Sequence, residues 1–286
     1  MTIKCRLCKF EGRAICDKKL DIGVAYRCSN CDSVCLDTKN PEFSYIFSGR
    51  SNAVSLADKV KRYMRARFNE GDFIQAYYFK WLSDKIDIAG IRNVLDIGCG
   101  KGMLLSLFNK AGKHVSGIEP DADMVMYSPV REKIRIEYFD AAMTFNERFD
   151  LVILGQCIDY YYNPIEILKK IDMTVNDRGY IFITAHNTMD DRIFDGLRLH
   201  APSAISKKLL EDFFKKNGYQ IIATDIMEPL SMKKGNILGR LSKNNRWLRF
   251  ISGIMNFYGF KFSDVYKREI NAAGAGYHVF FLARKK

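Results

Sequence analysis

The sequence contains no apolar run that approaches the roughly 18 residues of a membrane-spanning helix. Its first residues, "MTIKCRLCKF", lack the apolar core of a signal peptide. No internal repeat and no low-complexity segment is found. Hydrophobic residues nevertheless make up 48% of the 286 residues, too many for a disordered chain and enough for one α/β domain with additions. We therefore expect a folded cytoplasmic protein.

Acidic residues are scarce in the C-terminal part of the sequence. Residues 231–286 hold twelve Lys or Arg against only Asp264 and Glu269, so this segment carries +10 of the formal net charge of +12. Such a segment attracts nucleic acid, anionic lipid or a phosphorylated small molecule, without choosing among them.

An apolar stripe at helical spacing accompanies these basic residues in "GRLSKNNRWLRFISGIMNFYGF". The pattern predicts a helical insertion at about 231–270, which packs on the domain and keeps its basic face in solvent. The alternatives are binding of an acidic acceptor, peripheral contact with the anionic inner face of a membrane, and a contact in a homo-oligomer.

Strand-like and helix-like segments alternate from Asn93 onward. This alternation predicts an α/β fold with a doubly wound, seven-stranded, Rossmann-like sheet, and we assign residues 91–286 to that domain. Residues 41–90 contain "SNAVSLADKVKRYMRARF" and "DFIQAYYFKWLSDKI" and are predicted to form a helical linker. The seven predicted strands cover 93–98, 114–120, 134–140, 149–155, 179–186, 218–227 and 276–284.

Three glycines on alternate positions follow the first of these strands, in "VLDIGCGKG". A phosphate-binding P-loop requires Ser or Thr after Gly-Lys, but here Gly102 follows Lys101. A dinucleotide-binding loop would have its third glycine at Met103. The loop still lies at the carboxyl edge of the predicted sheet, where ligands bind close to bare backbone.

The remaining pattern, D-x-G-x-G-x-G, resembles motif I of the class I S-adenosylmethionine-dependent methyltransferases. An acid before the glycines suits this ligand, because S-adenosylmethionine carries an ammonium and a sulfonium and has no pyrophosphate. The resemblance implies that Glu119 binds the ribose hydroxyls and that Asp140 and Ala141 contact the adenine. The other residues expected at the cofactor are Asp96, Gly98, Cys99, Gly100, Gly102 and Gln156.

Six of the eight cysteines fall within the first 35 residues, and four form two C-x2-C pairs separated by 19 residues. This spacing is typical of a zinc ribbon, which we place at 1–40. The predicted ligands are Cys5, Cys8, Cys28 and Cys31. Four thiolates leave no position for water, so the Zn²⁺ is predicted to be structural, with a role in holding substrate as the alternative.

Two details of the cysteine region depart from the simplest pattern. Neither pair is followed by the glycine that is common in such zinc knuckles, because Lys9 and Asp32 stand there instead. Cys16 and Cys35 lie outside the pairs and are expected to be free thiols.

The order of ribbon, helical linker and methyltransferase domain resembles bacterial methyltransferases of surface-polysaccharide, sugar and secondary-metabolite pathways, over about residues 1–230. It implies methyl transfer, most simply to oxygen, on a sugar, a nucleotide-linked sugar, a polysaccharide or a related small molecule. One alternative is an RNA methyltransferase that holds RNA with the ribbon and the basic segment. Another is a non-catalytic scaffold that only binds the ligand.

A hydroxyl acceptor needs a base or hydrogen-bond acceptor beside it. His186, at the end of the fifth predicted strand, is our first candidate, and Asp159, after the fourth, is the second. Tyr160 occupies the position at which the related enzymes often have a histidine. His200 is the weakest candidate.

Overall fold

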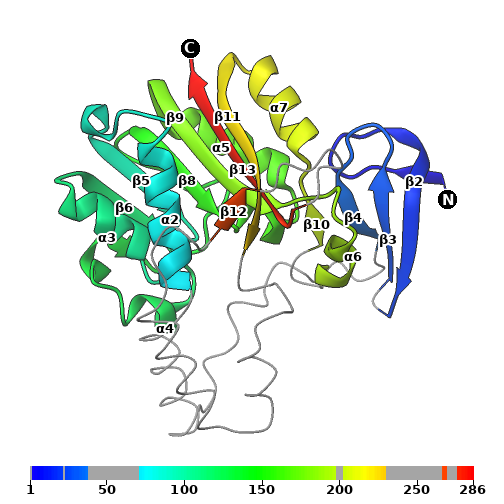
Figure 1. Cartoon of the computed structure of the whole chain (residues 1–286), viewed down its shortest axis with the longest axis horizontal. Coiled ribbons are helices and arrows are strands. Elements are labelled where there is room, and N and C mark those ends of the chain that lie inside the picture. Colours follow the sequence, from blue (N-terminus) through cyan, green and yellow to red (C-terminus); the bar gives the residue numbers. More distant parts are fainter. Residues whose placement is uncertain (1, 22, 38–70, 198–201, 230–265, 269–275) are drawn as a thin grey trace, which may run out of the picture.

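The computed structural model (Figure 1) describes residues 2–21, 23–37, 71–197, 202–229, 266–268 and 276–286. The predicted helix at 51–68, His200 and most of the predicted insertion at 231–270 lie outside these residues. The surfaces predicted for a membrane or a second copy lie outside them too. Within the described part, no helix is both long and apolar enough to cross a membrane.

The main sheet has the strand order β12-β11-β13-β9-β8-β5-β6-β7. Strands β7, β6, β5, β8 and β9 run parallel, and β13 runs antiparallel to both of its neighbours, β9 and β11. All seven predicted strands are present, and β12 adds a short edge. Their bounds are β5 Asn93–Ile97, β6 His114–Ile118, β7 Ile134–Arg135, β8 Phe149–Gly155, β9 Val175–His186, β11 Tyr219–Pro229, β12 Tyr266–Arg268 and β13 His278–Lys285.

The third predicted strand is much shorter than expected. Only Ile134–Arg135 pair with the sheet, whereas the prediction extended to residue 140. The chain leaves the sheet because Phe139 is buried in the core and Asp140 begins a turn, accepting hydrogen bonds from the backbone of Ala142 and Met143. Side-chain caps of this kind compete with a strand ladder for the backbone.

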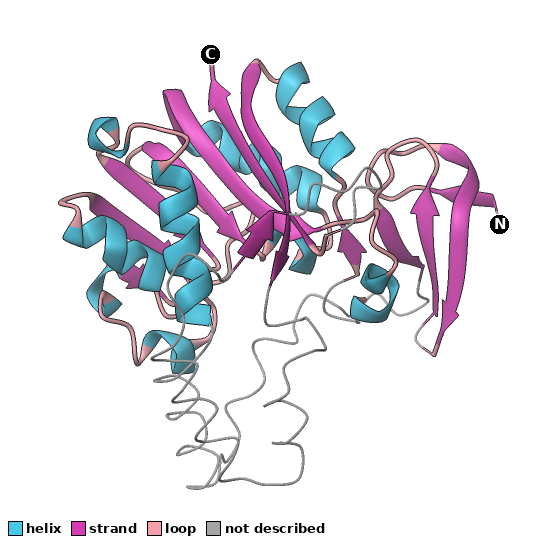
Figure 2. Ribbon diagram, in the orientation of Figure 1, coloured by secondary structure: helices cyan, strands magenta, loops and turns pink. Residues whose placement is uncertain are grey.

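Helices cover both faces of the sheet, so the predicted doubly wound arrangement is confirmed (Figure 2). On one face, Trp81 of α2 stacks on Phe182 with 5.2 Å between ring centroids and donates to Asp225 at 2.9 Å. On the other, Phe214 of α7 stacks on Phe281 at 5.3 Å. The two groups are α2 Gly71–Ser83, α3 Met103–Lys110 and α4 Ala122–Val125, and α5 Pro164–Thr174 and α7 Lys207–Lys216.

The N-terminal region forms a second sheet, β1-β2-β3-β4-β10, whose last strand comes from the part of the chain that forms the main sheet. Ser203 pairs with Cys35, and Ala204 with Val34. Beside this junction, α6 (Arg192–Gly196) packs its Ile193 and Phe194 on the sheet. The ribbon therefore shares hydrogen bonds and core with the large domain. The bounds are β1 Thr2–Lys4, β2 Glu11–Leu20, β3 Gly23–Cys28, β4 Val34–Asp37 and β10 Ser203–Ala204.

Candidate functional site

The described residues that were predicted to bind the cofactor or act in catalysis lie along one edge of the main sheet. Strands β5, β6, β8 and β9 all end there, and the antiparallel β13 begins there, so that His278 pairs directly with His186. We call the part at β5 and β6 the glycine-loop half and the part at β8, β9 and β13 the histidine half.

The glycine loop has a backbone that other residues adopt only with strain. Gly98, Gly100 and Gly102 have φ of +70°, +56° and +63°. A Cβ on Gly98 would lie 2.7 Å from the Cβ of Cys157, so this glycine also allows close packing with the loop after β8.

Two buried carboxylates, Asp96 and Glu119, lie beside this loop. Glu119 accepts from the Gly100 N–H at 2.8 Å and from the Asp121 N–H at 2.9 Å, so its carboxylate faces the loop. Burial raises the pKa of both carboxyls, and the charge of Glu119 raises that of Asp96 further. Among the residues that the structure describes, neither forms an ion pair. Their surroundings thus favour a ligand with positive charge and hydroxyl donors over a phosphate.

The other predicted cofactor residues take different positions. Cys99 is 1% exposed and its sulfur packs against Gly117, so only its backbone borders the loop. Asp140 and Ala141 are exposed, and the Asp140 carboxylate caps its own turn. Gln156 directs its amide to the ring of His278, at 3.1 Å from Nε2, and thus toward the histidine half.

The histidine half contains an Asp–His pair. Asp159, in the turn η4 (Ile158–Tyr160), is 2% exposed and holds Nδ1 of His186 at 2.8 Å. The same carboxylate accepts from the backbone of His186 at 3.2 Å and of Ile205 at 3.1 Å. Burial lowers the pKa of His186, but the hydrogen bond and charge of Asp159 outweigh it, so the pKa is raised. Because Nδ1 is bonded to Asp159, Nε2 is the ring nitrogen that can contact a bound substrate.

Aromatic and imidazole rings surround this pair. The rings of Tyr277 and His278 lie 5.2 and 5.5 Å from that of His186. Burial and the charges of His186 and Arg192 lower the pKa of His278 to about 3, which keeps its ring neutral. Burial, with Asp159 adding, raises the pKa of Tyr160, so its phenol stays protonated and is suited to donating a hydrogen bond.

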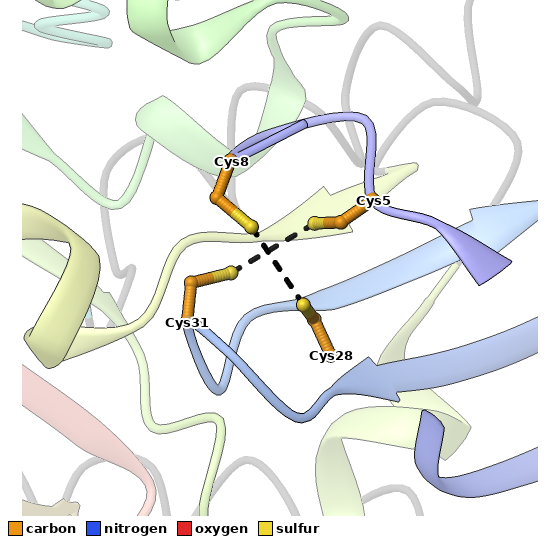
Figure 3. Close-up of side chains that lie close together, drawn as sticks. All are labelled: Cys5, Cys8, Cys28 and Cys31. Atoms are coloured by element: carbon orange, nitrogen blue, oxygen red, sulfur yellow. Dashed lines mark hydrogen bonds between the residues drawn. The ribbon is translucent and has the colours of Figure 1, made fainter. Parts of the chain in front are cut away.

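The four predicted zinc ligands come together (Figure 3). Their sulfur atoms all lie within 4.8 Å of one another, with Cys5 to Cys31 at 3.8 Å and Cys8 to Cys28 at 3.7 Å. A tetrahedral Zn²⁺ with Zn–S bonds of about 2.3 Å separates its sulfur ligands by about 3.8 Å. The four sulfur atoms therefore fit a tetrahedral zinc site, and all eight cysteines are free of disulfides.

Lys9 and Asp32 occupy the positions at which the two zinc knuckles would commonly have glycine. Their φ angles are 63° and 59°, the left-handed conformation that glycine would adopt more easily. Each backbone N–H returns to the first cysteine of its pair, Lys9 to Cys5 and Asp32 to Cys28, both at 2.9 Å. The knuckle geometry is thus present with non-glycine residues.

The sequence did not reveal the role of Cys35. This thiol is 1% exposed and hydrogen-bonds Cys5, and together with Cys31 it lowers the pKa of the Cys5 thiol. The pairing of β4 with β10 places Cys35 opposite Ser203, a contact between distant parts of the chain that no local pattern announces.

The ribbon also contacts the loops of the histidine half. The Arg6 guanidinium lies over the Tyr162 ring at 4.5 Å and donates to the Pro202 carbonyl at 2.9 Å. Arg27 forms an ion pair with Asp191 at 3.0 Å. No such contact joins the ribbon to the glycine loop among the described residues.

Comparison with known proteins agrees with this arrangement. The methyltransferase-domain family matches residues 52–259. The ubiquinone biosynthesis O-methyltransferase of Rhodopseudomonas palustris (strain BisA53) is 35% identical over 106 residues, which are 35% of this chain and 42% of that protein. That of Aeromonas salmonicida (strain A449) is 24% identical over 131 residues, 41% of this chain and 55% of that protein. The chain thus spans about half the length of the curated relatives it matches.

Two solved structures share the fold. A SAM-dependent methyltransferase from Archaeoglobus fulgidus is 16% identical with a TM-score of 0.52, covering 78% of this chain and 98% of that one. A putative sarcosine dimethylglycine methyltransferase from Galdieria sulphuraria is 15% identical with a TM-score of 0.51, covering 74% and 86%. Together with the family match over residues 52–259, the fold shows that this chain belongs to the methyltransferase-domain family.

Proposed function

We propose that this protein is an S-adenosylmethionine-dependent methyltransferase that methylates a hydroxyl group of a small metabolite. The observation that carries the proposal is the pairing, on one sheet edge, of a buried acidic glycine loop with an oriented histidine. The curated relatives named above are O-methyltransferases, which supports oxygen as the methylated atom.

The glycine-loop half would hold the cofactor. Glu119 accepts hydrogen bonds and suits ribose hydroxyls, whereas Asp96 supplies negative charge beneath the loop. Bound S-adenosylmethionine supplies an electrophilic methyl group on a sulfonium. Phosphates would meet two buried carboxylates here, so a dinucleotide is disfavoured.

The histidine half would activate the acceptor. Asp159 fixes the tautomer with the proton on Nδ1, which leaves the lone pair of Nε2 to take the hydroxyl proton. His186 is 23% exposed through its side chain, so an acceptor can reach it. Tyr160, 38% exposed, can donate a hydrogen bond to the acceptor or product.

For the acceptor we propose a sugar or nucleotide-linked sugar hydroxyl first and a phenolic hydroxyl second. The ribbon contributes the Arg6 guanidinium to the loops beside the histidine half, over the Tyr162 ring, which suits an acceptor with anionic groups. Zn²⁺ in the four-cysteine site would stabilise this side of the molecule without joining the chemistry.

The test combines binding with turnover. Calorimetry with S-adenosylmethionine should show one site per chain, and labelled methyl groups should appear on sugar, nucleotide-sugar or phenol acceptors. Absence of S-adenosylmethionine binding would overturn the proposal. RNA is tested as a competing acceptor by gel shift across a salt series, where a steep loss of binding with salt and methylation of the RNA would favour it.

A further inference from the structure

We propose that the segment 203–206 couples the four-cysteine site to the orientation of His186, with Ser33 and Ser206 as positioning residues. This inference rests on the proposed role of His186 as the base. It assigns to the zinc ribbon a part in organising the histidine half, beyond stabilising its own fold.

The first link joins the metal site to Ser206. The Ser206 hydroxyl donates to the carbonyl of Cys31, and its backbone N–H donates to the Ser33 hydroxyl at 3.0 Å. The Ser33 hydroxyl also interacts with the Cys31 thiol. Ser33 and Ser206 are 0% and 2% exposed, so water does not replace these contacts.

The second link joins the same segment to the Asp–His pair. Ile205, next to Ser206, donates its backbone N–H to Oδ1 of Asp159 at 3.1 Å, while Oδ2 holds His186. The neighbouring Ser203 and Ala204 are fixed by pairing with β4, which follows directly on the second knuckle. Among the described residues, the Asp159 carboxylate makes three hydrogen bonds, and one of them thus depends on a segment anchored to the ribbon.

These two links predict that disturbing the second knuckle lowers the pKa of His186. If the knuckle releases Ser206, Ile205 moves and Asp159 loses a donor and its fixed position. The stabilisation of protonated His186 by Asp159 then weakens while its burial persists, so the pKa of His186 falls. The groups that face His186 are Asp159, Tyr277 and His278, with Arg192 over the Tyr277 ring at 5.0 Å.

The experiment follows the imidazole resonances of the full-length, zinc-loaded protein by NMR as pH is varied. Ser33→Ala removes the hydroxyl that accepts the Ser206 N–H. Ser29→Ala is the matched control, because the Ser29 hydroxyl is exposed and donates to the Arg13 carbonyl, away from Ser206. We expect Ser33→Ala to keep its zinc and lower the His186 pKa by about half a unit or more. Ser29→Ala and the conservative Ser33→Thr should match the unmodified protein in the titration of His186.

Ser206→Gly and removal of zinc from the unmodified protein provide second perturbations if Ser33→Ala does not fold. Glycine retains most of the helix-capping preference at this position, so Ser206→Gly mainly removes the contact with Cys31. Unchanged His186 titration after zinc removal and in Ser206→Gly would overturn the inference. S-adenosylmethionine binding, measured in the same samples, should stay constant, and its absence from the unmodified protein would instead overturn the proposed function.

Discussion

The two halves of the site edge are built in opposite ways. The glycine-loop half uses residues close in sequence, from Asp96 to Glu119, and most of its shape is backbone. The histidine half gathers Asp159, His186 and His278 from three strands or loops, and the ribbon places Arg6 against the Tyr162 ring beside it. The glycine-loop half is therefore built mainly from one short stretch of the chain, whereas the histidine half depends on contacts between distant segments.

Of the changes proposed, loss of zinc should have the largest effect. It should impair the histidine half of the site and leave the glycine-loop half nearly unchanged. Cys28→Ser removes one thiolate and should release the ion, whose binding in structural sites is worth about 10–16 kcal/mol. Metal analysis should show loss of one zinc per chain, and methyl transfer should fall strongly, while S-adenosylmethionine affinity changes less than about threefold. The control Cys16→Ser should keep both, and retained zinc in Cys28→Ser would refute the site.

Replacing the base should separate chemistry from binding. His186→Asn removes the proton acceptor and should lower kcat by about 10²–10⁴-fold with unchanged S-adenosylmethionine affinity. His114→Asn alters an exposed histidine on β6 and should leave both unchanged. A His186→Asn enzyme with normal turnover would assign the base elsewhere.

Glu119→Ala should weaken S-adenosylmethionine binding and leave the histidine half unchanged. Loss of a charge-assisted contact to the ribose, worth about 1.5–3 kcal/mol, should weaken S-adenosylmethionine binding by about 10–150-fold. Zinc content and the His186 titration should stay as they are. Glu132→Ala, on an exposed acid of η3 (Arg131–Lys133), is the control, and equal affinity of the two variants would contradict the assignment.

The pH dependence of turnover should report the Asp159–His186 pair. Only neutral His186 accepts a proton, so the rate should fall about tenfold per pH unit below its pKa. Because that pKa is raised, the midpoint should lie above the ordinary value of 6.5. Asp159→Asn should move the midpoint down, and an unmoved midpoint would mean that another group titrates.

The smallest effect concerns the two strained knuckle residues. Lys9→Gly and Asp32→Gly relieve left-handed φ angles, a gain of about 1 kcal/mol each that the extra freedom of the unfolded chain reduces to about 0.5 kcal/mol. Denaturant unfolding of the zinc-loaded protein should detect this increase in the free energy of unfolding. Lys18→Gly within β2 should instead destabilise, and equal shifts in all three variants would refute the strain argument.

The residues of the glycine-loop half could be predicted from the sequence because they lie close together along the chain. Gly98 to Gly102 and Glu119 stand at fixed distances along the chain, and the cysteine pairs carry their spacing with them. The continuous apolar segments gave the buried strands β8 and β9 for the same reason. Asp140 shows the limit, since a strand-end acid and a turn cap have the same local sequence.

For the histidine half, two of the residues could be predicted from the sequence, but the contacts between them could not. His186 and Asp159 were predicted from their positions at strand ends, yet their contact depends on the packing of the parallel strands β8 and β9. Nothing local indicates that Ser206 meets Cys31, because 175 residues separate them. His278 was missed because its importance comes from antiparallel pairing with His186.

The placement of β13 has a consequence for how the chain is made. This strand follows β11 in sequence but lies between β9 and β11, so both of those strands have an unpaired edge until residues 278–285 leave the ribosome. Unpaired edges invite association with other nascent chains. The chain therefore completes the middle of its sheet last, and until then the free edges of β9 and β11 can pair with strands of other chains.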